Sequence, residues 1–328
     1  MKHRKIIGRL WLLLIVVIVS SLCIGRYAVP LTELGRILFG LPSGGDATMT
    51  TVIRNVRLPR ILLAGLIGAA LSAAGVCFQS VFQNPMASPD ILGASSGAGL
   101  GAALGLLCGL SARGVMLSAF VCGIVTIVGV FLIGARAQGK QVVNLILAGI
   151  MVGSLCNAGI SYIKLVADPT NQLPAITYWL MGSLSGVKWS DLQFFAPFIA
   201  VGAVPLLLLR WRINILSLGD DEARTMGVST DRLRWLVICC ATLLTAACVA
   251  VCGMIGWVGL VVPNLCRRLV GNDVRVLLPS GLLLGASFLL IVDNVSRSLL
   301  ATEIPIGILT AFIGAPFFLW MLMRKEKL

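Results

Sequence analysis

Three acidic residues and an arginine form a polar segment in an otherwise apolar chain. Asp220, Asp221 and Glu222 are consecutive, and Arg224 follows four residues after Asp220. Negative charge stabilises the N-terminus of a helix, Gly227 suits a helix C-cap, and the spacing of Asp220 and Arg224 allows an ion pair across one turn. The residues predict a short capped helix between two membrane spans, a shape that a soluble partner could bind. An ordinary solvated loop is the alternative.

Side chains for catalysis or metal binding are scarce. The single histidine, His3, lies in the N-terminal tail, so a Ser–His intramembrane protease is not favoured. The ten cysteines are scattered without a CxxC pair, as expected of small apolar side chains rather than metal ligands or disulfides. Residues 134–141 approach a phosphate-binding loop, but Gln141 replaces its Ser or Thr and a membrane helix precedes it. We expect no catalytic residue, metal site, cofactor or ATPase in this chain.

The elements that carry these residues are membrane helices. The chain has 328 residues, of which 58% are hydrophobic and 12% charged, with a mean hydropathy of +0.99. Such a composition indicates an all-α integral membrane protein without separate soluble domains. About ten apolar stretches are long enough to be spans, the eighth being short: 10–28, 61–79, 91–110, 115–134, 142–163, 192–209, 235–254, 256–270, 277–296 and 304–323.

Basic residues predict the orientation of these spans. If the N-terminus is cytoplasmic, the inner segments contain 17 of the 26 Lys and Arg residues and the outer segments contain 9. This predicts both termini, and the polar segment, on the cytoplasmic side of the cell membrane. The net charge of +13 is then a topology signal and not a reason to expect nucleic acid. The first span lacks a cleavage site and is expected to be retained.

The positions of the acids bear on the energy source. All 13 Asp and Glu residues lie in loops or near span ends. An ion-coupled carrier usually needs an ionisable group within the membrane, although broken helices can bind sodium through carbonyls alone. The pattern favours an energy source outside the chain over a secondary transporter. A non-transporting scaffold or intramembrane enzyme is less favoured still.

Small and aromatic residues add local expectations. Glycines recur every four residues from Gly93 to Gly109, a stripe that favours close helix packing over a pore lining. Residues 173–186, with Tyr178 and Trp179, predict a partial or re-entrant helix at the interface.

Several residues stand at the junctions of spans. Arg57 and Arg60 flank Leu-Pro at the start of a span, and Asp293 and Arg297 are spaced i,i+4 at the end of another. They are either interfacial anchors or an exposed cationic surface that docks an acidic extracellular partner. Residues 83–89 contain two prolines, which force a non-helical connection. A tight turn and a gate at the pore mouth both fit that connection.

Together these motifs resemble the permease subunits of type II ATP-binding-cassette (ABC) importers, which take up vitamin B12, ferric siderophores, ferric citrate and haem. The resemblance covers nearly the whole chain. It rests on Arg-Leu-Pro-Arg at 57–60, Gln-Asn-Pro-Met-Ala-Ser-Pro-Asp-Ile-Leu-Gly at 83–93, Leu-Ala-Gly at 147–149, Tyr-Trp-Leu-Met-Gly at 178–182, residues 218–227, Gly-Leu-Val-Val-Pro at 259–263, Ile-Pro-Ile-Gly at 304–307 and Gly-Ala-Pro at 314–316.

The resemblance implies a single permease domain over residues 1–328, paired with a second copy or a close relative, two cytoplasmic ATPase subunits and an extracytoplasmic binding protein. The cytoplasmic segment at 214–232 would contain the ATPase-coupling residues, which are Leu216, Ser217, Leu218, Gly219, Asp220, Asp221, Glu222, Ala223, Arg224, Thr225, Met226, Gly227 and Val228. Binding-protein docking would use Arg57, Arg60 and Arg297. The cytoplasmic gate would contain Asn84, Met86, Gln141, Val142 and Val143. The path would be lined by Asn144, Ser154, Asn157 and Ser161.

One departure is visible, because relatives commonly have His where this chain has Asn264. The substrate is less defined than the family. Pro-Asp-Ile-Leu-Gly at 89–93 is more similar to iron-chelate permeases than to B12 permeases, and haem and siderophores are not separated.

Overall fold

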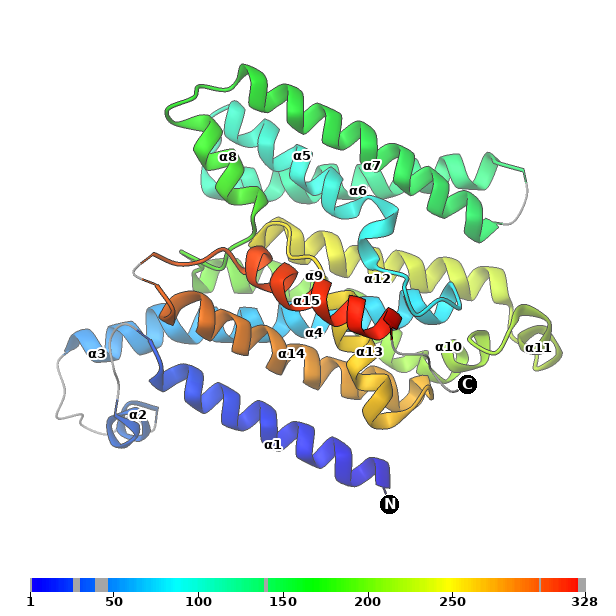
Figure 1. The fold of residues 1–328 in the computed structure, drawn as a ribbon, viewed down its shortest axis with the longest axis horizontal. Coiled ribbons are helices and arrows are strands. Elements are labelled where there is room, and N and C mark those ends of the chain that lie inside the picture. Colours follow the sequence, from blue (N-terminus) through cyan, green and yellow to red (C-terminus); the bar gives the residue numbers. More distant parts are fainter. Residues whose placement is uncertain (1, 26–29, 39–46, 139–140, 301, 324–328) are drawn as a thin grey trace.

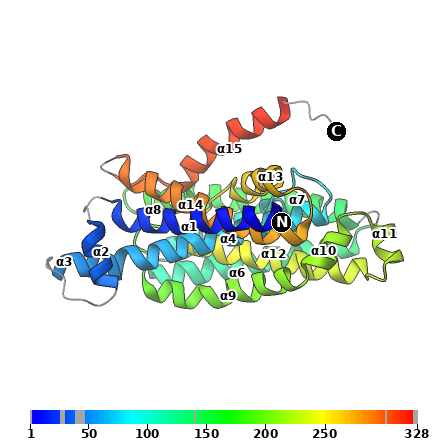
Figure 2. The same cartoon turned by 90° about the horizontal axis from the view of Figure 1, so that it is seen from below.

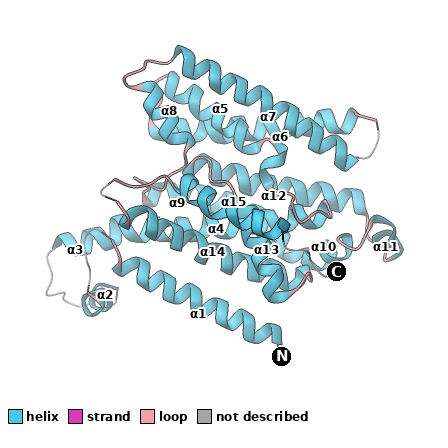
Figure 3. Ribbon diagram, viewed as in Figure 1, coloured by secondary structure: helices cyan, strands magenta, loops and turns pink. Residues whose placement is uncertain are grey.

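The computed structural model describes residues 2–25, 30–38, 47–138, 141–300 and 302–323 (Figure 1). This part of the chain contains helices and loops but no strand (Figure 3). In chain order the elements are α1 (Lys2–Cys23), α2 (Leu31–Leu38), α3 (Ala47–Thr51), the π-helical η1 (Val52–Arg57), α4 (Leu58–Val81), the 3-10 helix η2 (Pro89–Leu92), α5 (Ala94–Leu107), α6 (Ala112–Arg136), α7 (Gln141–Val166), α8 (Gln172–Leu180), α9 (Trp189–Leu208), α10 (Arg210–Leu216), α11 (Asp220–Thr225), α12 (Thr230–Cys252), α13 (Val258–Val270), α14 (Val274–Ser298) and α15 (Ile306–Met323).

Each of the ten predicted spans overlaps one helix, and the last residues of the first span, 26–28, lie outside the described residues. These helices are α1, α4, α5, α6, α7, α9, α12, α13, α14 and α15. Seven helices in the described chain are long and apolar enough to cross a membrane by themselves, whereas α5 and α13 have 14 and 13 residues. The expected shortness of the eighth span is confirmed in α13. The short helix predicted at 173–186 is also present, as α8.

Helix α4 forms the centre of the bundle and packs against α14, α12 and α13. Glycines allow the closest approaches. A Cβ on Gly75 would lie 1.9 Å from the carbonyl oxygen of Gly259, and one on Gly68 would lie 2.3 Å from that of Gly285. These backbones therefore touch directly, as small residues permit between membrane helices.

The glycine stripe of the third span packs α5 against α6. A Cβ on Gly101 would lie 2.3 Å from the carbonyl oxygen of Ser118, and the Ser118 hydroxyl donates to the Gly101 carbonyl at 2.7 Å. Gly97 faces Thr126 in the same way. The packing interpretation of the stripe is confirmed at these positions.

The second span begins earlier than its predicted first residue, Ile61. Helical structure runs without interruption through α3, η1 and α4. Pro59 lacks an N–H and its ring crowds the preceding turn. The wider π-helical turn of η1 immediately precedes it and relieves that crowding. Arg57 and Arg60 consequently lie on helical turns and not on an extended outer segment.

The two ends of the bundle carry different elements (Figure 1). The short helices α2, α3 and α8 lie at one end, which we call the α8 end. The start of α1 lies toward the other end together with α10 and α11, and we call this the α11 end. Helix α15 projects from the bundle on the face opposite α9 (Figure 2). One side of α15 is consequently not covered by the other described segments.

Candidate functional site

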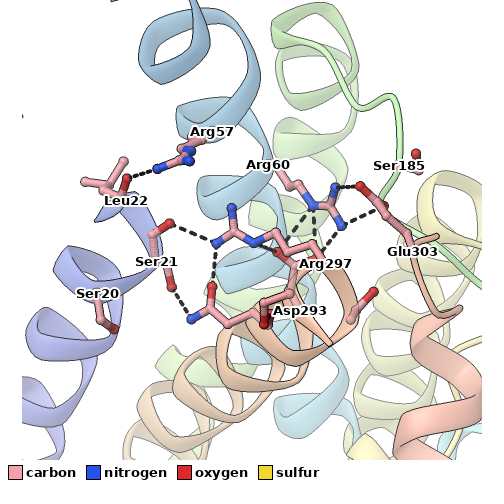
Figure 4. A network of polar contacts seen from close by, with 12 residues as sticks. Ser20, Ser21, Leu22, Arg57, Arg60, Ser185, Asp293, Arg297 and Glu303 are labelled. Atoms are coloured by element: carbon pink, nitrogen blue, oxygen red, sulfur yellow. Dashed lines mark hydrogen bonds and ion pairs between the residues drawn. The ribbon is translucent and has the colours of Figure 1, made fainter. Parts of the chain in front are cut away.

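A buried ion-pair network centred on Arg60 lies at the α8 end (Figure 4). The Arg60 Nε and Nη2 atoms donate to the Asp293 carboxylate of α14 at 3.0 and 2.8 Å. Its Nη1 and Nη2 also donate to Glu303, in the connection between α14 and α15, at 2.9 and 3.1 Å. The Asp293 side chain is fully buried and that of Arg60 is 8% exposed. Since a buried charge is costly unless it is paired, the two carboxylates hold this guanidinium in place.

Arg297 extends the network to the first helix. Its Nε lies 3.5 Å from Asp293 Oδ2, which confirms that the i,i+4 spacing brings these two residues together. The Arg297 Nη2 donates to the Ser21 carbonyl at 2.8 Å and to the Asn294 side-chain oxygen. Asn294 in turn donates to the Ser21 hydroxyl at 2.7 Å. The end of α1 is therefore fixed to α14.

Arg57 ties η1 to the same region. Its guanidinium donates to the carbonyl of Leu22 and, at 3.2 Å, to that of Cys23. Arg57 is 4% exposed and Arg60 is 7% exposed. The expectation that these arginines present freely exposed cations is wrong for the single chain, because carboxylates and helix-terminal carbonyls surround them.

A cavity of about 180 Å³ nevertheless reaches the arginines, and Arg57, Arg60, Arg297 and Glu303 line part of it. Asp293 lies beneath this cavity and is fully buried. A carboxylate that entered the cavity would meet guanidinium groups, which bind carboxylates through charge-assisted hydrogen bonds.

Glu303 was missed by reasoning from the sequence. It is 243 residues from Arg60 along the chain, and no spacing rule connects residues so far apart. Asn294 and Ser21 were missed for the same reason, since they are 273 residues apart.

The predicted coupling segment, residues 214–232, contains the end of α10, the whole of α11 and the start of α12, and lies at the α11 end (Figure 1). Gly219 and Gly227 flank α11 with φ of +140° and +76°, values that L-residues rarely adopt. Ala223 is fully buried, whereas Leu218 and Met226 are 62% and 57% exposed. The short capped helix is confirmed, and it presents two large apolar side chains.

The predicted pair of Asp220 with Arg224 is wrong. Asp220 accepts instead from Arg234 Nη2 of α12 at 2.5 Å. Arg224 lies 3.9 Å from Asp231, and its Nε donates to the Thr230 hydroxyl at 3.4 Å. The tertiary contact with α12 outweighs the local helical pair, because the Arg234 side chain is only 6% exposed and requires a carboxylate.

The coupling segment is also connected to α14. The Asn214 side-chain oxygen of α10 accepts from the Val274 backbone N–H at 2.8 Å. Asp273, which caps α14, receives the Arg275 guanidinium at 2.6 Å, and this hydrogen bond holds the pKa of Asp273 below its usual range. The end of α10 is therefore joined by a hydrogen bond to the start of α14.

The residues predicted for the cytoplasmic gate lie in the connection between α4 and η2 and at the start of α7. The Asn84 side-chain oxygen accepts from the Met86 backbone N–H at 2.9 Å, which forms a tight turn. Asn264 of α13 donates to the Pro85 carbonyl at 3.1 Å and so fixes this turn to the bundle. Met86 and, on α7, Val143 are 42% and 48% exposed.

The other two predicted gate residues, Gln141 and Val142, open α7. Val142 is partly buried, and the Gln141 side chain lies outside the described part of the structure. Elements α7 and η2 pack against each other, and a Cβ on Gly149 would lie 2.3 Å from the Ile91 carbonyl oxygen.

Three of the four residues predicted for the path share one exposed face of α7. Ser154, Asn157 and Ser161 are exposed, and each serine hydroxyl donates to the carbonyl four residues before it. Asn144 has a different position, because its amide donates to the carbonyls of Ala137 and Gln138 at 3.0 and 3.3 Å. Asn144 thus anchors the connection between α6 and α7.

A protein-family model agrees with this arrangement. The model, described as the FecCD transport family, matches residues 13–324. A solved structure described as an inward-facing conformation of a putative metal-chelate type ABC transporter superimposes with a TM-score of 0.88. It is 42% identical in sequence, and the match covers 97% of this chain and 99% of that one.

Curated relatives have similar length and several different names. The molybdate import system permease protein MolB of Haemophilus influenzae is 43% identical, over 96% of this chain and 94% of its own. The cobalamin import system permease protein BtuC of Halobacterium salinarum is 40% identical, over 92% and 78%. The Fe(3+)-citrate permease YfmE of Bacillus subtilis and the hemin permease HmuU of Yersinia pestis are 40% and 35% identical, each over 99% of this chain and 97% of its own.

Proposed function

The chain belongs to the FecCD transport family and is the permease of an ABC importer, a multi-pass protein of the cell membrane, and on this basis we propose that it imports a metal chelate. Residues 1–328 would form one permease domain with both termini cytoplasmic. The observation that carries the substrate class is the similarity to the 42% identical solved structure described as a putative metal-chelate type ABC transporter. The coupling segment projects from the α11 end with Leu218 and Met226 exposed. We infer that a separate ATPase subunit binds it, so that hydrolysis occurs outside this chain.

The proposed coupling surface consists of residues 216–228. Exposed apolar side chains outside the membrane favour a protein partner, and the Asp220–Arg234 pair fixes α11 to α12. Motion of a bound ATPase would reach α12 through this pair and α14 through Asn214. Both helices pack against α4, so α12 and α14 connect the coupling surface to the centre of the bundle.

At the α8 end we propose docking of an extracytoplasmic binding protein. Its acidic side chains would pair with Arg57, Arg60 and Arg297, and the cavity that these three arginines line supports this role. The arginines are already partnered within the chain. Docking would therefore be an exchange of carboxylates, in which a side chain of the partner competes with Glu303 for Arg60.

A second permease copy would complete the path. The face of α7 with Ser154, Asn157 and Ser161 is exposed, and α15 projects with one side uncovered. A cavity of about 660 Å³ lies between α15 and the segments around Met181 and Met254. We infer that two such faces meet around a central path gated at its α11 end by Asn84, Met86 and residues 141–143.

The substrate proposal is an iron chelate, a ferric siderophore or haem, with cobalamin as an alternative carried by the same mechanism. A second candidate is molybdate, which the name of the 43% identical relative favours. The proposed path face carries hydroxyl and amide groups, and its one charged side chain among the described residues, Lys164, lies in the last turn of α7. Such a lining suits a large solute held by few polar contacts, and discrimination would then reside mainly in the binding protein.

Uptake by cells expressing this chain with its ATPase and binding protein tests the proposal. We expect ATP-dependent accumulation of a labelled ferric siderophore or of haem, abolished when the ATPase cannot hydrolyse ATP. Accumulation of molybdate, but of neither iron compound, would show that molybdate is the substrate. Uptake driven by an ion gradient without the ATPase would contradict the importer mechanism itself.

A further inference from the structure

An open groove lies between α6 and α9 at the α8 end. Figure 2 shows α9 along the face opposite α15, where no other part of the described chain covers it. The helices meet through Phe120, whose ring centroid is 4.9 Å from that of Phe198 and 6.3 Å from that of Phe195. Above these rings, toward the first turns of both helices, they enclose a cavity of about 450 Å³.

The cavity is polar at its rim and apolar below. Arg113, in the first turn of α6, and Ser190 and Asp191, in the first turn of α9, line the rim. One turn deeper the wall is formed by Leu117 and Phe194. Both helices start here, so the rim lies at the level of the membrane interface and the apolar wall lies at the level of the acyl chains.

Two opposite charges face this cavity without neutralising each other. Arg113 is exposed and forms no ion pair with any described residue. Asp191 is 8% exposed and accepts hydrogen bonds from the Lys188 backbone N–H at 2.9 Å and the Ser190 hydroxyl at 3.4 Å. No cationic side chain within the described ranges lies within 4.0 Å of its carboxylate. The N-terminus of α9 compensates part of the Asp191 charge, and a cation bound at the rim would stabilise this carboxylate further.

We propose that this cavity binds a zwitterionic phospholipid with a primary ammonium group, of the phosphatidylethanolamine type. Its phosphate pairs with Arg113, its ammonium donates to Asp191, and an acyl chain lies along Leu117 and Phe194. The volume of about 450 Å³ accommodates a headgroup with the upper part of a chain. Phosphatidylglycerol has no cation for Asp191, and the quaternary ammonium of phosphatidylcholine has no N–H to donate.

The test uses the full-length protein in nanodiscs of mixed phosphatidylethanolamine and phosphatidylglycerol, followed by native mass spectrometry of the lipids that remain bound. We expect the wild type to retain phosphatidylethanolamine preferentially. Asp191→Asn keeps an acceptor for the Lys188 N–H, so α9 stays capped, while the charge is removed. Asp191→Asn and Arg113→Gln should each reduce that preference about tenfold, as expected for one charge-assisted hydrogen bond.

Arg136→Gln is the matched control, because Arg136 is exposed in the last turn of the same helix. This variant should retain the lipid as the wild type does. A wild type that retains phosphatidylglycerol equally well would overturn the proposal. So would an Asp191→Asn variant whose phosphatidylethanolamine retention is unchanged. Thermal unfolding of each variant separates loss of the lipid site from loss of the fold.

Discussion

Asp293 is the carboxylate that holds the α8 end together. It is fully buried in α14 and accepts from Arg60 while Arg297 lies 3.5 Å away. Glu303 binds the opposite side of the Arg60 guanidinium from a loop. The two carboxylates are thus placed differently, since one belongs to a packed helix and the other to a connection. We expect them to behave differently when removed.

Asp293→Asn should destabilise the protein. The substitution leaves two buried guanidinium groups with one carboxylate between them, and breaking a buried ion pair costs about 3 kcal/mol. Thermal unfolding in detergent should show a clear decrease in Tm. Asp221→Asn is the control, because Asp221 is exposed on α11 and should leave the Tm unchanged. Equal Tm values for both variants would show that the network is not structural.

Glu303→Gln should strengthen docking of the binding protein. The change removes the Glu303 carboxylate that competes for Arg60, while Asp293 still holds the guanidinium. In the permease without its binding protein, Arg60 then has one ion pair fewer. We expect an affinity about threefold higher at low salt, with the difference decreasing as salt is added. Surface plasmon resonance on the reconstituted permease measures it. A weaker complex would indicate that Glu303 positions Arg60 for docking and does not compete.

The sequence indicated which charged residues matter at the α8 end better than it indicated which residues they contact. Arg57, Arg60 and Arg297 were identified from their motifs, and the spacing of Asp293 and Arg297 indicated their contact. The partner of Asp220 was predicted wrongly, because Arg234 reaches it from the next helix. Local spacing rules describe one helix, whereas buried charges choose partners across the fold.

The C-terminal end of α11 requires a glycine, Gly227, two residues after its last helical residue. Gly227 has a φ of +76°, and a Cβ there would meet no atom within 4 Å. The requirement for glycine is therefore conformational and not steric.

Gly227→Val should impair coupling and Gly227→Asn should largely preserve it. A β-branched residue in the left-handed region costs about 1–2 kcal/mol, whereas Asn tolerates that region. For the valine variant, reconstituted with its ATPase in proteoliposomes, we expect the loaded binding protein to stimulate ATP hydrolysis less than for the wild type. Membrane insertion should be intact. Equal hydrolysis by the valine variant and the wild type would argue that the end of α11 does not matter for coupling.

The packing of α5 on α6 offers a second test among the elements. Gly101→Leu would place side-chain atoms on the Ser118 carbonyl, already 2.3 Å from a bare Cβ, and should separate the helices. We expect a loss of about 2 kcal/mol or more, typical of overpacking, and poor recovery of folded protein. Gly129→Ala on α6 is the control, since its Cβ would lie in open space. Size-exclusion chromatography reads out both variants, and a well-folded Gly101→Leu protein would contradict the assigned contact.

The elements were predictable because each membrane helix shows its own apolar stretch. All ten stretches became helices, and the short eighth span was already visible in the sequence. The start of α4 was not, because a proline normally marks the beginning of a helix. The π-helical turn before Pro59 lets the helix continue through the proline.

The molecule has two candidate sites at opposite ends of one helix bundle. The coupling surface lies at the α11 end and the arginine network at the α8 end, and α4 and α14 extend between them (Figure 1). This arrangement allows an event at one end to bias the other. The family resemblance, rather than any residue pattern, supplied the identity of the partners, since a permease carries no catalytic signature.

The affinity of the ATPase subunits for the permease reports on the proposed coupling role of residues 216–228. Leu218→Ser with Met226→Ser removes the two exposed apolar side chains of the coupling surface while leaving the Asp220–Arg234 pair and both flanking glycines intact. We expect the double variant to insert normally, to keep the wild-type Tm and to bind the ATPase subunits at least about tenfold more weakly. Unchanged affinity in a correctly folded double variant would contradict the assignment of residues 216–228 as the site where ATP hydrolysis is coupled to transport.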